Sequence, residues 1–458
     1  MYGIIHIMPE KLEKTYKLEQ PRSDNSSSSI EKLLELFNPD RRREAMTKAQ
    51  ADYLSWQDFK NKSWATENKE HVWALIRSQR TFNARISPIF DKGGQCYKFN
   101  PNAHSQFLHE VDLELGGSMI GINDFSEGDK RQIIRRNLIE ESIASSKLEG
   151  ANTSREAARR MLNEARKPRD KHEQMIVNNH AAMKRIEEDA KSEPMSMDLL
   201  KNLHRQVTND TLSDPVLEGA LRQTFDSKGN RLKIMPWDET TVVYIAPDRE
   251  FVDAQLPELI KFANDQDDAG WIHPLFKAIM LHFWIGLLHP FEDGNGRVAR
   301  ILFYWYMLRK GYWAFSYLSL SEKIVNSPKQ YAMAYIYAEQ DNYDLNYFIH
   351  YNVSKLKLAH NDLQKYLRQK ITENKKSLQL LQSDHNFNMR QLRLLQYLSK
   401  DEQRNTTVGL YHNINSDVGY LAAINDLRKL VDADFLTKRK VGRNVFYAPT
   451  EKVRSLFK

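Results

Sequence analysis

The sequence predicts a mainly α-helical protein with one β-hairpin and a small α+β module at its C-terminal end. Apolar residues recur at helical spacing through most of the 458 residues. The segment 219–247 instead collects β-branched and aromatic residues around two turn signals, Lys228-Gly229-Asn230 and Pro236, which is typical of a hairpin. Residues 385–458 show three helical patterns followed by two short strand patterns.

The composition is that of an ordinary globular chain and excludes several protein classes. Hydrophobic residues make up 41% and charged residues 28%, and 18 glycines and 15 prolines are too few for a collagen-like or broadly disordered protein. At ~150 residues per domain, the length suggests about three domains. The apolar stretch Ala278 to Phe291 is shorter than the ~20 residues that a membrane-spanning helix needs. We therefore expect no membrane partner.

The single cysteine and the N-terminus bear on cellular location. Cys96 has no second cysteine to pair with, which rules out an intramolecular disulfide and CxxC-type zinc or iron–sulfur sites. The first residues, MYGIIHIMPEKLEK, lack the basic region and the small-residue cleavage site of a secretory signal. Both features favour a reducing, cytoplasmic location.

Residues 1–120 are expected to form a mostly helical region whose role the sequence does not reveal. A short apolar run from Tyr2 to Met8 suggests a strand, and the Ser-rich segment 20–30 suggests a flexible stretch. Helical patterns then dominate from Ile30 to about Gly117, with a break at Gly93-Gly94.

Residues 121–353 are expected to form the helical core. A long helix is predicted over about 127–150, with apolar Ile134 and Leu138 four residues apart and Gly150 as its stop signal. Helical patterns continue to about Val207 and return after the hairpin. A charged helical connector is expected over 354–384, before the C-terminal module.

The most informative stretch is 289–300, with the sequence HPFEDGNGRVAR. Proline stops regular structure at His289-Pro290, and Gly294-Asn295-Gly296 then opens a helical pattern. Small residues allow the backbone to approach a ligand closely, and a helix start offers free N–H groups and a positive dipole end, so this pattern predicts a phosphate cradle. Arg297 and Arg300 can bind phosphate oxygens with forked guanidinium groups.

Two further side chains of this loop are candidates for a metal ligand and a general base. Asp293 lies beside the cradle, where a carboxylate can hold a hard divalent cation, Mg²⁺ or Mn²⁺, that bridges phosphates. His289 stands at the start of the loop, where it can act as a general base. Each residue taken alone has an ordinary structural explanation. A base, a metal ligand, a cradle and two phosphate clamps within one short loop favour phosphate chemistry.

The same string resembles the Fic family signature, HPFx(D/E)GNGRxxR, at every fixed position, and His273 to His282 resembles the helix that precedes it. The resemblance covers about Arg131 to Tyr351 and implies an all-helical Fic core. Fic proteins mostly transfer AMP from ATP to a hydroxyl of a target protein, so the resemblance implies ATP as substrate, a protein partner and Mg²⁺ as cofactor. It implies that His289 deprotonates a Ser, Thr or Tyr hydroxyl, which then attacks the α-phosphorus.

By the same resemblance, Gly294, Asn295 and Gly296 present the cradle, Arg297 and Arg300 hold the β- and γ-phosphates, and Asp293 binds the metal. Phe291 pins the loop into the core. The hairpin at 219–247 lies where Fic proteins carry a flap, which holds a target segment by strand addition. The candidates for the nucleotide-side edge of the flap are Val243, Tyr244, Ile245 and Ala246. The alternative is a hairpin that only packs on the core.

A second motif lies upstream, at Ser145 to Gly150. Ser145 and Glu149 are four residues apart, so they share a helix face, and Gly150 lets the helix stop. By itself this is an ordinary helix end. The string nevertheless resembles the Fic inhibitory motif, (S/T)xxxE(G/N), which implies self-inhibition by pairing of Glu149 with Arg300.

The C-terminal module, 385–458, resembles a winged helix. It carries 13 Lys/Arg and 7 Asp/Glu, which is +6 of the net charge of +7. A first helix is expected over Met389 to Leu398, and a recognition helix from near Ser416. A basic turn between two strands would be the wing, and its cations, Lys438, Arg439, Lys440 and Arg443, are candidates for phosphate contacts with DNA. Winged helices also bind proteins, so DNA and protein remain alternative partners, and a homodimer is left open.

The leading functional hypothesis is therefore a self-inhibited protein adenylyltransferase with a winged-helix module. A second hypothesis keeps the enzyme but uses another phosphate-containing donor. A third is a DNA-binding regulator whose core only senses nucleotide. Incubation with labelled ATP separates them, because covalent label on protein supports the first, and binding without transfer supports the third.

Overall fold

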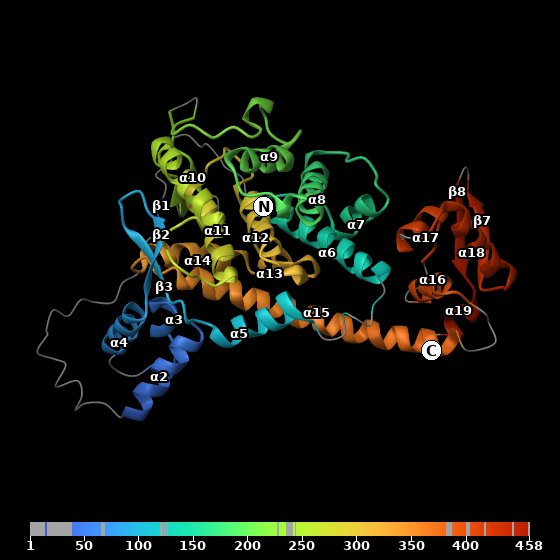
Figure 1. Ribbon diagram of the computed structural model, residues 1–458, viewed down its shortest axis with the longest axis horizontal. Helices are drawn as coiled ribbons and strands as arrows, with labels where there is room; N and C mark the ends of the chain where they lie inside the picture. The colour runs from blue at the N-terminus through green and yellow to red at the C-terminus, as the bar shows by residue number, and fades with distance from the viewer. Residues whose placement is uncertain are drawn as a thin grey trace, which may run out of the picture.

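The structure is a computed structural model of the chain, and it is mainly helical, as predicted (Figure 1). The residues it describes are 14–15, 39–65, 69–119, 122, 125, 127–226, 229–234, 241–242, 244–381, 387–399, 404–415, 418–441 and 444–456. The predicted strand from Tyr2 to Met8 and the Ser-rich stretch 20–30 lie outside these residues.

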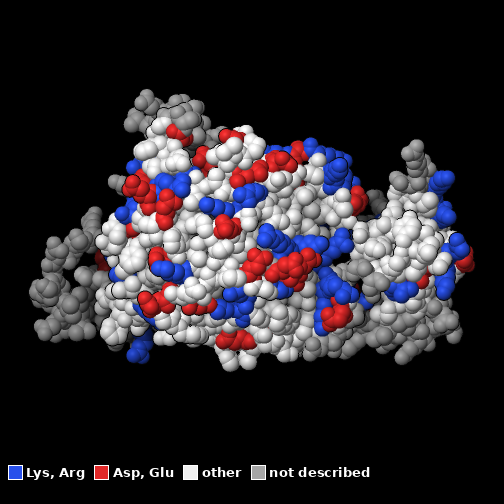
Figure 2. Space-filling view, turned by 45° about the horizontal axis from the view of Figure 1, so that its top comes forward, with Lys and Arg blue, Asp and Glu red and all other residues white. Residues whose placement is uncertain are grey.

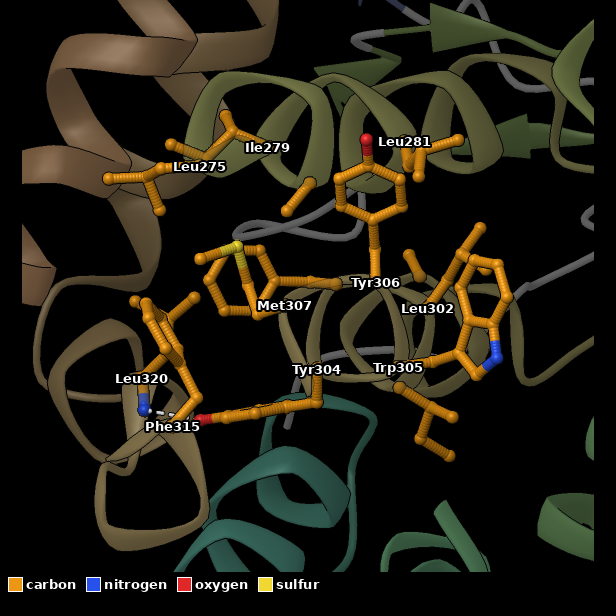
Figure 3. Packing of buried hydrophobic residues seen from close by; sticks show 14 of the residues in the cluster. Leu275, Ile279, Leu281, Leu302, Tyr304, Trp305, Tyr306, Met307, Phe315 and Leu320 are labelled. Carbon is orange, nitrogen blue, oxygen red and sulfur yellow. Dashed lines mark hydrogen bonds between the residues drawn. The ribbon is translucent and has the colours of Figure 1, made fainter. Parts of the chain in front are cut away.

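Two antiparallel helices, α11 (Pro274–Leu288) and α12 (Asn295–Arg309), form the centre of the molecule. Nearly every side chain of both helices is buried, which is expected of helices that are enclosed on all sides. Figure 3 shows their interdigitated side chains, with Leu302 and Met307 of α12 facing residues of α11 such as Leu281. The loop that joins these helices is 289–294, so the core holds both ends of this loop in place.

The surrounding helices cover this pair on all sides (Figure 1). They are α6 (Glu127–Leu148), α7 (Arg155–Asn163), α8 (Lys171–Glu188), α9 (Met197–Thr208), α10 (Arg249–Ala263), α13 (Leu320–Ile324), α14 (Pro328–Gln340) and α15 (Asn346–Leu381). Among the described helices, none combines the length and the apolar character that crossing a membrane requires.

Helix α6 covers Glu127–Leu148, within the range that its apolar spacing predicted. Its buried Glu141 accepts hydrogen bonds from the hydroxyls of Tyr304 and Ser319, both at 2.9 Å, and from the main-chain N–H of Ser321 at 2.9 Å. A buried carboxylate is tolerated only when donors surround it. Because these donors come from α12 and the start of α13, Glu141 fixes where α6 lies against α12.

The described part of the N-terminal region is only partly helical, and the helical prediction for Ile30 to Gly117 is wrong between Arg85 and Phe99. The helices α2 (Pro39–Ala51), α3 (Trp56–Lys60) and α4 (Lys69–Phe82) share a small apolar core. They are followed by an antiparallel hairpin of β2 (Arg85–Phe90) and β3 (Cys96–Phe99) around the Gly93-Gly94 break. Burial alternates along both strands, which is a period-2 pattern too short to stand out beside its helical neighbours. The helix α5 (Ser105–Glu110) and a π-helical turn, Val111–Gly117, complete this region.

The predicted hairpin at 219–247 is present but short. Strand β4 (Lys233–Ile234) pairs antiparallel with β6 (Tyr244–Ile245), and β5 (Thr241–Val242) immediately precedes β6. Phe225 and Arg231 form an additional antiparallel bridge near its base. Strand β1 (Lys14–Thr15) pairs in parallel with β5. Val243 and residues 235–240, with the predicted turn at Pro236, lie outside the described residues.

The C-terminal module has its own apolar core and follows α15, which runs without a break through the expected boundary at 353/354. Its elements are α16 (Met389–Ser399), α17 (Val408–Ile414), α18 (Tyr420–Asp432), the antiparallel pair β7 (Leu436–Val441) and β8 (Asn444–Pro449), and α19 (Glu451–Leu456). Helix α19 was not predicted. Helix α18 begins at Tyr420 and not near Ser416, because Gly419 is its extended N-cap. Whether this module is a winged helix stays a prediction.

Candidate active site

His289 ends α11 in the left-handed backbone region, with φ 46° and ψ 57°. Residues other than glycine rarely adopt this conformation, and such strain concentrates at functional sites. The ring atom Nδ1 faces the carbonyl of Gly286 at 3.4 Å, which favours a proton on Nδ1 and a lone pair on Nε2. Burial, together with the charge of Arg222, lowers the pKa of His289 to about 4. The imidazole is therefore neutral at pH 7 and able to accept a proton.

The loop after His289 forms a tight turn into α12. Gly294 has φ 84°, and a side chain there would also approach the Thr208 methyl group to 2.8 Å, so only glycine fits. The buried side chain of Asn295 exchanges two hydrogen bonds with the main chain of Phe291, at 2.9 and 2.8 Å. Asn295 thus holds the loop with its side chain. Only its main-chain N–H, with those of Gly296 and Arg297, remains to face an anion.

The two arginines of α12 are buried, yet part of each guanidinium group has no acceptor. Arg297 donates from Nη1 to the carbonyl of Val207 at 2.6 Å. Within the described part of the chain, its Nε and Nη2, and Nη1 of Arg300, make no hydrogen bond of good geometry. Buried donors are nearly always paired, so these orphaned nitrogens indicate a ligand with several acceptor oxygens. Phosphate groups at the start of a helix meet that requirement.

Ser145 and Glu149 occupy the remaining donors of Arg300. Its Nε donates to Ser145 Oγ at 2.8 Å, and its Nη2 donates to the carbonyl of Ser145 at 2.9 Å and to Glu149 Oε1 at 3.0 Å. The same carboxylate oxygen lies only 2.1 Å from where a Cβ of Gly296 would stand. The structure therefore places the Glu149 carboxylate directly over the start of α12, where the cradle would receive an anion.

Asp293 lies at the edge of the cradle and is partly exposed. Its Oδ1 accepts from the N–H of Gly294 at 2.6 Å, and its Oδ2 lies 3.8 Å from Arg297 Nη2. Within the described ranges, no three His, Cys, Asp or Glu side chains gather as metal ligands. One carboxylate fits Mg²⁺ when substrate phosphates supply the other oxygens, since Mg²⁺ is often held in that way.

His204 of α9 supports the loop, a role that no sequence pattern predicted. Its ring stacks on Phe291 with centroids 3.8 Å apart, and its Nδ1 accepts from the N–H of Gly219 at 2.9 Å. Its Nε2 therefore donates to the carbonyl of Asp293 at 2.8 Å. A histidine among the apolar positions of a helix gave no signal for this role, because its partners are main-chain groups of two distant loops.

Arg222 joins the base of the flap to the loop, and this role too was not predicted from the sequence. It donates from Nε to the carbonyl of His289 at 2.6 Å and from Nη2 to the carbonyl of Pro247 at 2.7 Å. Of the predicted flap residues, Tyr244 donates its hydroxyl to the carbonyl of Leu287 at 2.9 Å, while Ala246 is buried. The hairpin is thereby fastened beside the end of α11.

Of the predicted cations of the C-terminal module, Lys438, Arg439 and Lys440 are exposed on β7, and Arg443 lies outside the described residues. Figure 2 shows basic side chains along the outer edge of this module with few acidic ones among them. On the rest of that face, acidic and basic groups are mixed.

The sequence profile of the Fic/DOC family matches residues 194–307, a range that contains α9, the flap, α11, the loop and most of α12. Residues 194–307 form a Fic domain. The chain is similar to protein adenylyltransferase fic-1 of Caenorhabditis elegans, with 32% identity over 118 residues, which cover 26% of this chain and 20% of that protein. It is also similar to protein adenylyltransferase Fic of Culex quinquefasciatus, with 29% identity over 147 residues, which cover 31% of this chain and 26% of that protein.

The chain thus spans about a fifth to a quarter of the length of these curated relatives. Among solved structures, a Fic family protein from Desulfovibrio desulfuricans aligns with a TM-score of 0.46 and 17% identity, over 75% of this chain and 95% of the other. Fic-1 of C. elegans aligns with a TM-score of 0.45 and 18% identity, over 75% of this chain and 92% of the other.

Proposed function

We propose that this protein is a protein adenylyltransferase, which transfers AMP from ATP to a Ser, Thr or Tyr hydroxyl of a target protein, and that Glu149 holds it inactive. The observation that carries the proposal is the set of buried guanidinium nitrogens of Arg297 and Arg300 that make no hydrogen bond within the described residues, at the start of the helix that follows His289 and its loop. A triphosphate supplies the many charged oxygens that two buried arginines and a helix start require.

In this mechanism, the main-chain N–H groups at the start of α12 and the two arginines bind the phosphates and orient the α-phosphorus. His289, neutral because burial lowers its pKa, accepts the proton of the attacking hydroxyl at Nε2. The attacking oxygen bonds to the α-phosphorus and pyrophosphate leaves in line. Positioning and charge neutralisation supply most of the acceleration in such reactions.

Asp293 would hold Mg²⁺ or Mn²⁺, which when bound neutralises charge on the α- and β-phosphates. His204 and Arg222 act on main-chain carbonyls of the loop, at Asp293 and His289, and so are positioning residues. We also propose a cytoplasmic location, on the strength of the single cysteine alone.

The test is incubation of the full chain with ATP labelled at the α-phosphate, with Mg²⁺ and with a host lysate. Because Glu149 is expected to inhibit, the Glu149→Gly variant is tested beside the wild type. AMP on protein, read by mass spectrometry, supports the proposal. ATP binding with no covalent label would favour the nucleotide-sensing alternative, and label from another phosphate-containing donor alone would favour the other transferase.

The rate of AMP transfer should fall only at strongly acidic pH. Since the pKa of His289 is lowered to about 4, the imidazole stays unprotonated above about pH 5 and is lost as a base only as pH falls through 4. Transfer by Glu149→Gly should therefore change little between pH 7.5 and about pH 5.5, with ATP binding measured at each pH as the control. An acid limb near pH 6.5 that ATP binding does not share would contradict this assignment.

We further propose that the C-terminal module binds DNA, because its net charge of +6 is concentrated in a small unit with exposed Lys438, Arg439 and Lys440. Successive strand residues point to opposite faces, so Lys438 and Lys440 share one face of β7 and Arg439 lies on the other. We therefore expect either Lys438 and Lys440 or Arg439, but not all three side chains, to contact the phosphate backbone of one DNA duplex.

Affinity for duplex DNA should then fall steeply with salt concentration. The Lys438→Gln/Lys440→Gln variant should reduce the slope of log affinity against log salt by about one unit per lost contact, and Arg439→Gln should be the matched control on the other face. Equilibrium binding to a labelled duplex at several salt concentrations measures both slopes. No binding, or binding that ignores salt, would point to a protein partner.

A further inference from the structure

The C-terminal module contacts α6 at the end opposite to Glu149 (Figure 1). Arg393 of α16 forms an ion pair with Asp129 in the first turn of α6, with Nη2 and Oδ1 2.9 Å apart. The two side chains are only 17% and 16% exposed, so solvent screens this pair less than an ordinary surface ion pair. The module is therefore attached to the helix that leads into the inhibitory carboxylate.

The same module also contacts α7. The side-chain amide of Asn413 in α17 donates to the carbonyl of Asn163, the last residue of α7, at 2.6 Å. Arg135 of α6 donates from Nη2 to the same carbonyl at 3.4 Å. The last carbonyls of a helix have no partner within that helix, so this bond from the module satisfies a group that needs one. The module thus binds the end of α7 at the point where α7 meets α6.

Helices α6 and α7 form an antiparallel pair that is closed by the connection 149–154. Arg155 of α7 donates from Nε to the buried Glu140 of α6 at 2.6 Å, and Arg159 pairs with the same carboxylate. The connection begins with Glu149, whose carboxylate accepts from Arg300 at 3.0 Å. The module therefore contacts the open end of the pair, and the inhibitory carboxylate lies at the closed end, about 30 Å farther along α6.

The shape of α6 allows a displacement at one end to reach the other. The helix contains no proline, and its only glycine is in the first turn, so nothing in its sequence favours a kink between Asp129 and Leu148. Glu141 fixes α6 between its two ends, through its bonds to Tyr304 of α12 and to the N–H of Ser321. A shift of the N-terminal end therefore tilts the helix about this point and moves the end that leads into Glu149.

We propose that the C-terminal module strengthens inhibition by Glu149, because it holds α6 and α7 in the position that places the carboxylate over the start of α12. This inference rests on the proposed function. A γ-phosphate can bind Arg300 fully only when Glu149 leaves, so any contact that favours the inhibited position opposes productive ATP binding. By linkage, ATP in turn weakens the contact between the module and α6. A partner that draws the module away from α6 therefore activates transfer.

The first test is AMP transfer by the full-length Arg393→Glu variant, in which the ion pair with Asp129 becomes a repulsion. Its rate should exceed that of the wild type by roughly fivefold or more, since coupling between two sites is typically of that size. Arg428→Glu, at an exposed arginine of α18, is the matched control and should keep the wild-type rate. In the Glu149→Gly background, Arg393→Glu should change the rate less than about twofold, because the carboxylate it releases is already gone. No gain over wild type, or the same gain in both backgrounds, would overturn the proposal.

Two further variants assign the effect to these contacts. Arg393→Glu/Asp129→Arg restores an attraction with the charges exchanged, and its rate should return toward the wild-type value. Asn413→Ala removes only the bond to α7 and leaves the apolar core of the module intact, so it should show a smaller gain in the same direction. A gain that persists in the charge-exchanged variant, together with none in Asn413→Ala, would overturn the role of this interface.

The second test needs no transfer of AMP. The N–H groups of Glu149, Gly150 and Ala151 donate to carbonyls in the last turn of α6 at 3.0–3.1 Å, so their hydrogen exchange reports on this end of the helix. In Arg393→Glu they should exchange roughly tenfold faster, while the amides of α18 keep wild-type rates and so show that the module stays folded. ATP affinity, measured by calorimetry, should rise by a factor similar to the gain in rate. If no variant transfers AMP, Glu149→Gly included, the proposed function fails. Unchanged exchange and ATP affinity would overturn the present inference in either case.

Discussion

Replacing Glu149 with glycine should raise the rate of AMP transfer by roughly tenfold to several-hundredfold. The Glu149 carboxylate occupies a donor of Arg300 at 3.0 Å and lies over Gly296 at the start of α12. A charge-assisted hydrogen bond of this kind contributes ~1.5–3 kcal/mol, and each 1.36 kcal/mol removed from a barrier is about tenfold in rate. Repulsion between the carboxylate and the triphosphate adds to this. Because α6 ends at Leu148, glycine at position 149 should not break the helix.

The measurement is auto-modification by wild type and Glu149→Gly at saturating ATP. Glu149→Gln is the matched variant, because it keeps the size of the side chain and removes its charge, so it should be activated less than glycine. Arg300→Ala should not be activated, since it removes the phosphate clamp together with the inhibitory contact. Equal rates for wild type and Glu149→Gly would mean that Ser145 to Gly150 is only a helix end.

Replacing His289 should reduce transfer by ~10²–10⁴-fold while leaving ATP binding largely intact, since loss of a general base typically has that effect. His289 is expected to contact the transferred proton, whereas α12 and its arginines hold the nucleotide. The left-handed backbone at this position matters for the choice of variant, because alanine tolerates φ 46° poorly. We therefore expect the same loss in His289→Asn, since asparagine adopts that conformation more readily and cannot act as the base.

Both variants are made in the Glu149→Gly background, and ATP affinity and transfer rate are measured separately. His172→Ala is the matched control, because His172 is an exposed histidine of α8 and has no place in the mechanism. Loss of ATP binding in His289→Ala but not in His289→Asn would assign the effect to the backbone. Near-full transfer by His289→Asn would remove His289 from the chemistry.

Local sequence patterns were sufficient for the elements that repeat regularly over many residues. Apolar spacing and a glycine stop placed α6 at its observed range, and the proline and glycines of 289–296 predicted the turn between α11 and α12. The β2–β3 hairpin was not predicted, because each strand is short and its pairing depends on the turn at Gly93-Gly94. Long periodic segments carry their own structural signal, whereas short strands depend on a partner.

Some features of the candidate site could likewise be predicted from residue types, and others depended on tertiary contacts. The residue types in 289–300 were sufficient to predict a phosphate cradle, a base and a metal ligand, whereas the inhibitory role of Glu149 is implied only by the resemblance of Ser145 to Gly150 to the Fic inhibitory motif. The residue types did not predict the part played by Asn295. Its side chain binds the main chain of Phe291, so only its main-chain N–H remains for an anion. The roles of Ser145, His204 and Arg222 in the structure likewise come from hydrogen bonds to atoms of other segments.

The sequence by itself therefore determined the helical character of this protein, the Fic signature and the residue types at the site, because these follow from local spacing and side-chain chemistry. The tertiary structure alone decided that Glu141 fixes α6 against α12, that Glu149 lies over Gly296, and that Lys14–Thr15 pairs with the flap. Each of these is a contact between segments far apart in the chain. Such contacts depend on how buried donors and acceptors find partners once the core has packed, and no local pattern records that outcome.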